Sequence, residues 1–216
     1  MNIRKKSISI ILVIALCLTV IASPSYANAL EKDSDIKVSR LGENSYMLDI
    51  GGEESIVEYE YLGDCTITNV TEKSTGEQYY FIRDNIKNTI YSSLTDTTID
   101  IVDSDANSNI MAKSASERNA EIKRISTAKI YSAVSATGNA TKIATYILSY
   151  FNIIGGTTAL IIRVLSGAAI GTAAALKKYY KDVQLEVYEY LRSTTKNGKV
   201  YKYWVKSYRN VTLIKY

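Results

Sequence analysis

Lysine and tyrosine side chains gather in one short stretch of the chain, residues 177–181, which has the sequence Lys-Lys-Tyr-Tyr-Lys. Ammonium groups attract anionic headgroups, and phenol rings favour the boundary between water and an apolar phase. We therefore expect this stretch, together with part of the C-terminal segment, to contact an anionic bacterial membrane or cell envelope. The side chains expected to make this contact are Lys177, Lys178, Tyr179, Tyr180, Lys181, Trp204 and Lys206.

Histidine, a residue on which much enzyme chemistry depends, is missing. Its absence excludes Ser-His-Asp and Cys-His catalysis and the common zinc sites. Cys65 is the only cysteine after residue 29, so that part of the chain can form no internal disulfide. Carboxylate-pair and tyrosine-based chemistry stay open, but no pair stands out. We predict a protein that is not an enzyme, with no catalytic residues and no cofactor.

One acidic segment, Asp103–Asn107, has the composition of the opening of a calcium-binding loop. Ser108 stands where such a loop requires glycine, and Ser114 stands where it requires a bidentate glutamate. The surrounding residues 96–120 are polar and show no hydrophobic periodicity. We therefore predict a protease-accessible linker here and no metal site.

The first 29 residues have the three parts of a secretory signal. A basic start with Arg4, Lys5 and Lys6 precedes a long uncharged stretch, and small residues follow at Ala27 and Ala29. This order predicts a signal peptide that is cleaved after Ala29, and hence a secreted, extracellular protein. The alternative is a retained anchor helix, for which the apolar run is shorter than the roughly 20 residues that a span prefers.

The remaining chain consists of two halves with opposite charge. Residues 30–110 carry 17 acidic and 6 basic side chains, a net charge of −11, whereas residues 111–216 carry 5 acidic and 17 basic ones, a net charge of +12. Such asymmetry indicates a partner of opposite charge, or one half that masks the other. A single globule with a dipolar surface remains the alternative.

The acidic half has the pattern of an antiparallel β-meander. Short runs rich in β-branched and aromatic residues are separated by turn compositions such as LGEN, GGE, GD and KSTG. Alternation is clearest in residues 55–62, where Val57 and Tyr59 point away from Glu58 and Glu60. The predicted strands are residues 36–40, 44–50, 54–62, 65–72 and 77–82.

The centre of the basic half is almost free of charge. Between Ile143 and Leu176 the only charged residue is Arg163. Gly155-Gly156 should break a helix, because each glycine costs roughly 1 kcal/mol relative to alanine. We therefore expect two helices, over residues 126–154 and 157–179. Both insertion into a membrane and burial as a helical hairpin stay open, although Arg163 argues against a permanent transmembrane helix.

A row of small residues lies within the second expected helix. Gly167 and Gly171 are four residues apart, and Ala175 continues the row. Residues at this spacing share one helix stripe and allow another helix backbone to approach closely. The row predicts close helix packing or self-association.

A β-hairpin closes the chain. Asn197-Gly198 is a strong signal for a two-residue hairpin turn, since both positions tolerate positive φ. Placing Lys196 opposite Lys199 sets a register in which Leu191 faces Trp204, Glu189 faces Lys206 and Val187 faces Tyr208. A basic aromatic ribbon can also bind nucleic acid, but the predicted export argues against that partner.

Together these patterns predict an α+β fold. It comprises an N-terminal antiparallel β-meander, central apolar helices broken at Gly155-Gly156, and a C-terminal β-hairpin. The expected segments are the signal peptide (1–29), an acidic β-rich domain (30–105), a linker or start of a helix (106–125), an apolar helical region (126–181) and a basic, tyrosine-rich hairpin (182–216).

The layout resembles that of large secreted bacteriocin-like proteins of Gram-positive bacteria, of the geobacillin type. The segments that carry the resemblance are the Gly/Ala-rich GGTTALIIRVLSGAAIGTAAALKKYY and the Tyr/Lys-rich VYKYWVKSYRNVTLIKY. The resemblance concerns layout and texture, is best over residues 120–216, and carries over no catalytic residue. It implies inhibition of neighbouring bacteria by action on their membranes.

Three hypotheses follow. In the first, the protein is a secreted antibacterial protein whose cationic half perturbs target membranes, while the acidic half shields it until cleavage near residues 100–120. In the second, it is a non-enzymatic binding or structural protein of a Gram-positive cell envelope, with both halves in one mixed domain. In the third, the apolar segment anchors it in the membrane of the producing cell.

Overall fold

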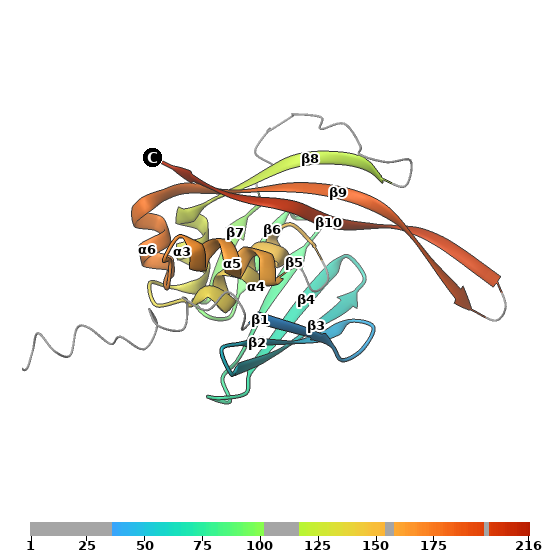
Figure 1. Ribbon diagram of the computed structural model, residues 1–216, viewed down its shortest axis with the longest axis horizontal. Coiled ribbons are helices and arrows are strands. Elements are labelled where there is room, and N and C mark those ends of the chain that lie inside the picture. The colour runs from blue at the N-terminus through green and yellow to red at the C-terminus, as the bar shows by residue number, and fades with distance from the viewer. Residues whose placement is uncertain (1–35, 102–116, 154–157, 197–198) are drawn as a thin grey trace, which may run out of the picture.

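The computed structural model describes residues 36–101, 117–153, 158–196 and 199–216. They form an α+β fold with two antiparallel sheets and four helices, which lie in sequence between the first and second strands of the second sheet. The first sheet is a seven-stranded meander in which strands adjacent in sequence are adjacent in space (Figure 1). Its strands are β1 (Ile36–Arg40), β2 (Ser45–Ile50), β3 (Glu53–Leu62), β4 (Cys65–Glu72), β5 (Gln78–Asp84), β6 (Thr89–Ser92) and β7 (Thr97–Asp100).

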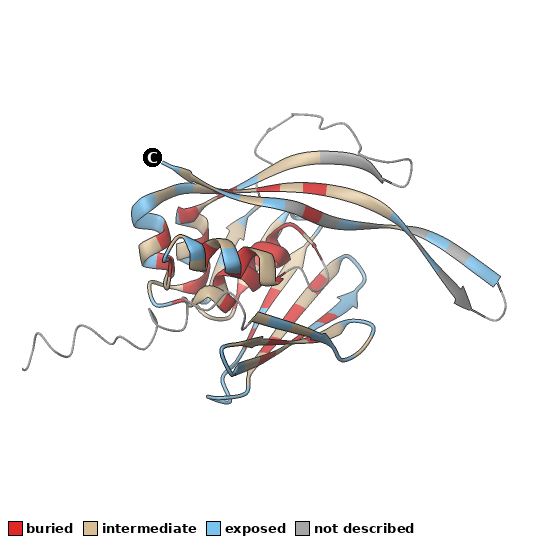
Figure 2. Ribbon diagram, viewed as in Figure 1, coloured by how far each residue is buried: buried red, intermediate tan, exposed pale blue. Residues whose placement is uncertain are grey.

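The second sheet has three strands, in the order β10-β9-β8. They are β8 (Glu117–Ser126), β9 (Tyr180–Lys196) and β10 (Lys199–Lys215). The helices are α3 (Thr127–Val134), α4 (Ala140–Tyr150), α5 (Thr158–Gly167) and α6 (Ala173–Tyr179). They lie between the two sheets, so that each sheet buries one face against them (Figures 1 and 2).

The predicted meander is confirmed because its signals are local. In β3 the buried Val57 and Tyr59 alternate with the exposed Glu58 and Glu60, which gives the sheet one apolar face and one wet face. Gly51-Gly52 joins β2 to β3 with φ of 61° and 92°, the left-handed region that a two-residue hairpin turn requires. The first five predicted strands are therefore found within two residues of their expected ends.

The segment predicted as a linker or the start of a helix is partly strand. Residues 117–126 form β8, which pairs with β9 so that Ile125 lies opposite Val183. Residues 97–100, which form β7, lie in the part predicted as the acidic β-rich domain. The charged residues of β8 hide its alternation from sequence reasoning, and the strand gains its backbone hydrogen bonds from a partner about 60 residues away in sequence. The calcium-loop candidate and much of the linker that was predicted to be protease-accessible fall in residues 102–116, which lie outside the described residues.

The prediction of two long helices is wrong, since four shorter ones form. Ser135 and Ala169 adopt positive φ, 65° and 55°, which ends the helical path after α3 and after α5. The side chains of Asn139 and Thr172 then cap α4 and α6 by each accepting a hydrogen bond from the backbone N–H three residues on. Residues 154–157, including Gly155-Gly156, lie outside the described residues, although α4 ends before them and α5 begins after them.

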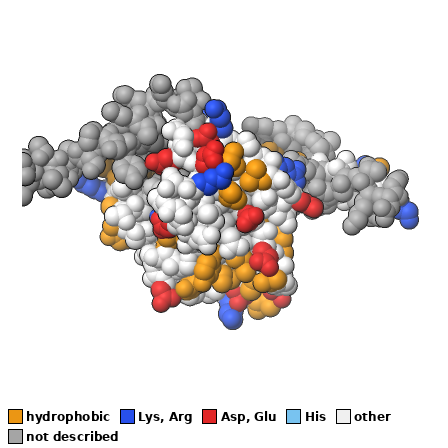
Figure 3. All heavy atoms as spheres, turned by 90° about the horizontal axis from the view of Figure 1, so that it is seen from below, with side chains coloured by type: hydrophobic (Ala, Val, Ile, Leu, Met, Phe, Trp, Pro, Cys, Tyr) orange, Lys and Arg blue, Asp and Glu red, His pale blue; other side chains and the backbone are white. Residues whose placement is uncertain are grey.

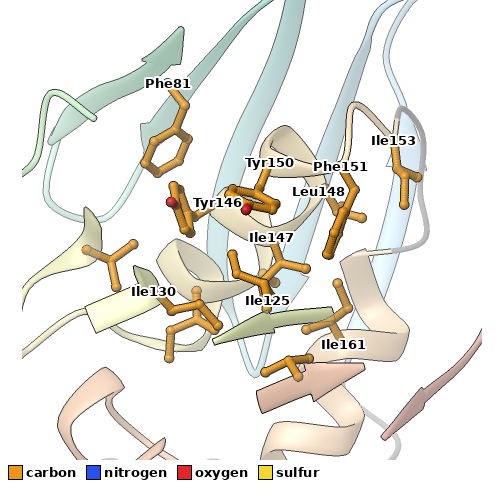
Figure 4. Packing of buried hydrophobic residues seen from close by; sticks show 14 of the residues in the cluster. Phe81, Ile125, Ile130, Tyr146, Ile147, Leu148, Tyr150, Phe151, Ile153 and Ile161 are labelled. Carbon is orange, nitrogen blue, oxygen red and sulfur yellow. The ribbon is translucent and has the colours of Figure 1, made fainter. Parts of the chain in front are cut away.

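Helix α4 is the centre of the hydrophobic core. The Tyr146 ring is fully buried and lies 5.4 Å from the Phe81 ring of β5 and 6.1 Å from the Tyr150 ring, measured between centroids (Figure 4). The buried residues of both sheets and all four helices form one cluster. The apolar stretch that begins at Ile143 is therefore the shared core of the acidic and basic halves.

Polar contacts also join the two halves. Lys142 of α4 lies 2.8 Å from the carboxylate of Glu77 and 3.8 Å from that of Glu72, both in the acidic half. The Tyr46 hydroxyl hydrogen-bonds Thr158 of α5 at 2.8 Å and Tyr59 at 3.1 Å. Burial raises the pKa of Tyr46 and of Tyr59, so both remain neutral hydroxyl groups at physiological pH. The opposite charges of the halves thus meet within one folded unit.

The helices are too short to span a bilayer individually. Among the described residues, no helix combines the length and the apolar character needed to cross a membrane.

A turn at residues 135–139 positions the last helix, α6. A substitution at Gly138 tests how closely this turn is packed. The backbone N–H groups of Ala173 and Ala174 donate to the carbonyl oxygens of Gly138 and Ala136, at 2.9 and 3.2 Å. A Cβ at Gly138 would lie 2.5 Å from the carbonyl oxygen of Val134. Overpacking of this kind costs about 1–3 kcal/mol. We therefore expect Gly138→Ala to lower the free energy of unfolding by that amount in urea titrations.

Gly171→Ala is the matched control, because a Cβ at Gly171 would meet no atom within 4 Å. We expect this variant to stay within about 0.5 kcal/mol of the wild type. Equal effects of the two substitutions would contradict the close packing of the 135–139 turn.

Candidate functional site

The expected lysine and tyrosine side chains meet two further residues at one corner of the fold. The last turn of α6, the start of β9 and the end of β10 converge there, next to the C-terminus (Figure 1). Six exposed residues make up this site, which we call the basic corner: Lys177, Lys178, Tyr179, Lys181, Lys215 and Tyr216. Tyr179 and Tyr216 are 54% and 78% exposed, which is unusual for rings of this size.

Local hydrogen bonds hold the backbone of the corner in place. The buried hydroxyl of Thr127 donates to the carbonyl oxygens of Tyr180 and Lys181, at 2.7 and 3.1 Å. The Tyr216 hydroxyl donates to the carbonyl oxygen of Lys177 at 3.2 Å and so ties the last residue to α6. These contacts connect the start of β9 to α3 and the C-terminal residue to α6.

The strand pairing at the corner projects Lys181 outward. Tyr180 lies opposite Lys215 and Asp182 opposite Ile214, so Lys181 is the extra residue of a β-bulge. Bulges bend a strand and redirect one side chain. The bulge therefore exposes Lys181 beside the lysines of α6.

Two ammonium groups of the corner contact aromatic rings. Within the part of the chain that the structure describes, none of the ion pairs involves Lys177, Lys178, Lys181 or Lys215. Lys177 instead places its ammonium group 4.3 Å from the centroid of the Tyr131 ring, and Lys178 lies 5.2 Å from that of Tyr179. Such cation–π contacts orient the ammonium groups and are worth only about 0.5–1 kcal/mol at exposed sites. The charges can thus act on an external anion.

The structure separates two predicted contact residues from the others. Trp204 and Lys206 lie along β10, opposite Leu191 and Glu189. Lys215 is eleven positions after Trp204, which corresponds to roughly 36 Å at about 3.3 Å per residue of strand. Tyr180 belongs to the corner by position, but its side chain is half-buried. The predicted set therefore divides into a corner and a distant strand segment.

The small residues expected to form one helix stripe do not share a helix. Gly167 is the last residue of α5, Gly171 lies between helices, and Ala175 belongs to α6. A Cβ at either glycine would meet no atom within 4 Å. Since the stripe needs an unbroken helix, the prediction from four-residue spacing is wrong for packing within this chain.

The hairpin register is confirmed. The structure pairs Lys196 with Lys199, Leu191 with Trp204, Glu189 with Lys206, and Val187 with Tyr208. Asn197 and Gly198 themselves lie outside the described residues.

Sequence reasoning missed Lys215, Tyr216 and Tyr131. Extending the predicted hairpin register to the end of the chain places Lys215 opposite Tyr180. The sequence could therefore have predicted that Lys215 and Tyr216 lie beside residues 177–181. Tyr131 had none, because its contact with Lys177 depends on the packing of α3 against α6.

The side chains of the basic corner are ammonium and phenol groups. Over the described residues, no group of three or more histidine, cysteine, aspartate or glutamate side chains is arranged to hold a metal ion. The arrangement is suited to attracting a phosphate-bearing surface and to placing phenol rings at its boundary.

The chain matches no protein-family model, no curated protein and no solved structure.

Proposed function

We propose that this chain is a non-enzymatic, exported bacterial protein that binds a phosphate-bearing envelope surface through its basic corner. The observation that carries the proposal is the exposure of four lysines and two tyrosines at one rigid corner, with no carboxylate paired to the lysines among the described residues. Each lysine close to an anionic surface contributes about 1 kcal/mol. Four of them support reversible binding that salt weakens.

Burial of the apolar segment favours surface binding over membrane damage. Ile143, Ile147 and Leu148 of α4 are fully buried in the core that both halves share. Exposing them to lipid would require the core to open, which costs a large part of the roughly 5–15 kcal/mol that stabilises a typical folded protein. Peripheral binding leaves the fold intact.

Antibacterial action on membranes is the second candidate. It is favoured by the stretch between Ile143 and Leu176, whose only charge is Arg163. In that mechanism the basic corner would bring the protein to a target membrane, and the apolar helices would enter the lipid after the core opens. Export would then separate the activity from the producing cell.

The first experiment measures binding and leakage together. Residues 30–216 would be mixed with vesicles of phosphatidylglycerol loaded with dye, or of phosphatidylcholine, and separately with purified teichoic acid. We expect binding to the phosphatidylglycerol vesicles in 50 mM salt, at least tenfold weaker binding in 500 mM salt, and no dye release. Comparison with teichoic acid distinguishes a lipid headgroup from a wall phosphate.

Absence of binding to both phosphate-bearing samples in 50 mM salt would rule out the proposal. Dye release at micromolar protein would instead favour the antibacterial candidate.

A further inference from the structure

The β9–β10 hairpin extends beyond the body of the protein. Strand β8 pairs with β9 as far as Tyr190, so residues 191–196 and 199–204 form a two-stranded arm (Figure 1). A two-stranded ribbon alone is at best marginally stable in water. Its length therefore points to a surface against which it packs.

One face of the arm continues the apolar face of the core. Strand positions alternate, so Leu191 shares a face with the buried Val183, Leu185 and Val187. Beyond the body, that face holds Leu191 and Val200, which are 36% and 64% exposed, and Trp204 opposite Leu191. Lys202, opposite Ser193, lies between Trp204 and Val200 on the same face, so the face combines exposed apolar side chains with a positive charge. Exposed apolar side chains on a projecting ribbon are typical of an interaction site.

The arm is also cationic. Residues 191–204 include Arg192, Lys196, Lys199 and Lys202 and no acidic residue. The partner should therefore offer apolar area bordered by carboxylates.

The outer face of the seven-stranded sheet has that composition. Cross-strand pairing places Glu60, Ile67, Ile82 and Tyr91 in one row of neighbours. In the adjacent row Glu58 pairs with Asn69, which pairs with Tyr80, and the Tyr80 ring lies 6.0 Å from that of Tyr91.

The helices lie against the opposite face of this sheet, where the buried side chains of its strands point. Exposed side chains on the outer face include Glu58, Glu60 and Tyr80. Figure 3 shows hydrophobic and acidic side chains side by side on the surface seen from below.

We propose that the arm of one copy of this chain docks on the outer sheet face of a second copy. Charge decides between the two ways in which copies could pair. Two arms repel, because each adds four positive charges. An arm that docks through the face with Leu191 brings Lys202 to Glu58 and Glu60, and Lys199 on its other face adds attraction at longer range. Each copy retains one arm and one face, so the contact is heterologous and propagates into open chains unless the rotation closes a ring.

The basic corner lies at the opposite end of the hairpin from the arm tip. It stays accessible in such an assembly. Association would thus present many corners to one surface and raise the overall affinity by avidity. Self-association itself does not depend on the proposed function.

A charge-swap experiment tests the contact in residues 30–216, the chain that the predicted signal cleavage would leave. The face variant is Glu58→Lys with Glu60→Lys, and the arm variant is Lys199→Glu with Lys202→Glu. Sedimentation velocity is measured from 1 to 200 µM in 50 mM salt. We expect the wild type to associate as concentration rises, and each variant alone to remain monomeric. An equimolar mixture of the two variants should associate again, because unlike charges face each other at both new contacts.

A wild type that remains monomeric over this range would overturn the inference. So would variants that associate as well as the wild type, or a mixture that stays monomeric while both variants retain the wild-type circular dichroism spectrum. Vesicle binding through the basic corner is measured with the monomeric variants, so its outcome is independent of association.

Discussion

Replacing Tyr146 with alanine is expected to destabilise the folded protein by about 3–5 kcal/mol, the range found for large buried aromatic side chains. Tyr146 is fully buried and contacts the ring of Phe81 in the acidic sheet. Its loss should weaken both halves in a single unfolding transition, because they share one core. Urea unfolding is followed by circular dichroism and separately by Trp204 fluorescence. The two curves measure the loss of unfolding free energy and show whether the two probes report the same transition.

Tyr146→Phe is the matched control. The Tyr146 hydroxyl is buried, and no hydrogen-bond partner for it is found within the described chain. An unsatisfied buried hydroxyl costs about 1–3 kcal/mol, so removing it should leave stability unchanged or raise it. A phenylalanine variant as unstable as the alanine variant, or separate transitions for the two probes, would contradict the shared core.

Neutralising three lysines of the basic corner is expected to abolish most of the binding to anionic vesicles. Lys177→Gln, Lys178→Gln and Lys181→Gln together remove about 3 kcal/mol of attraction at about 1 kcal/mol per lysine. That loss corresponds to a roughly 100-fold larger dissociation constant. Co-sedimentation with phosphatidylglycerol vesicles in 50 mM salt measures it.

The matched control neutralises three lysines of the acidic sheet instead. Lys37, Lys73 and Lys87 lie on β1 or in the β4–β5 and β5–β6 turns, and their replacement by glutamine changes the net charge of the chain equally. We expect less than a threefold change in binding. Equal losses in the two triple variants would show that net charge, rather than the corner, determines the affinity.

The strands could be predicted because their signals are local. Alternation in β3 and the Gly51-Gly52 turn act within a few residues, and the Asn197-Gly198 turn set the register of the long hairpin as far as Val187 and Tyr208. Strand β8 could not be predicted, since its pairing with β9 depends on the rest of the fold.

The helices were harder to predict for a physical reason. Uniform apolarity between Ile143 and Leu176 conceals where a helix ends, and it fits a membrane segment as well as a core. Positive φ at Ser135 and Ala169, neither of them glycine, ends two helices at positions with no sequence signal. Helix α4 is buried because it packs between two sheets. This burial depends on the assembled fold, so the sequence of the helix alone could not predict it.

The candidate site was predictable where residue type was sufficient. Lys177 and Lys178 stand out from composition alone, and the structure places them beside Lys215 through the hairpin register. Trp204 lies far from this corner because β10 is long. The turn signal predicts which residues pair, but it does not by itself show how far apart two residues of one strand lie. Surface sites assembled from distant segments therefore need the register before they can be recognised.

The central claim is that the basic corner, and not the arm, meets the anionic surface, and tryptophan fluorescence tests it directly. The chain has one tryptophan, Trp204, so the wild type reports on the base of the arm, where Trp204 pairs with Leu191. The variant Tyr179→Trp with Trp204→Phe moves the reporter to the corner. We expect phosphatidylglycerol vesicles to shift the emission of the corner reporter to shorter wavelength and to leave that of Trp204 unchanged. A shift of Trp204 without a shift of the corner reporter would contradict the account.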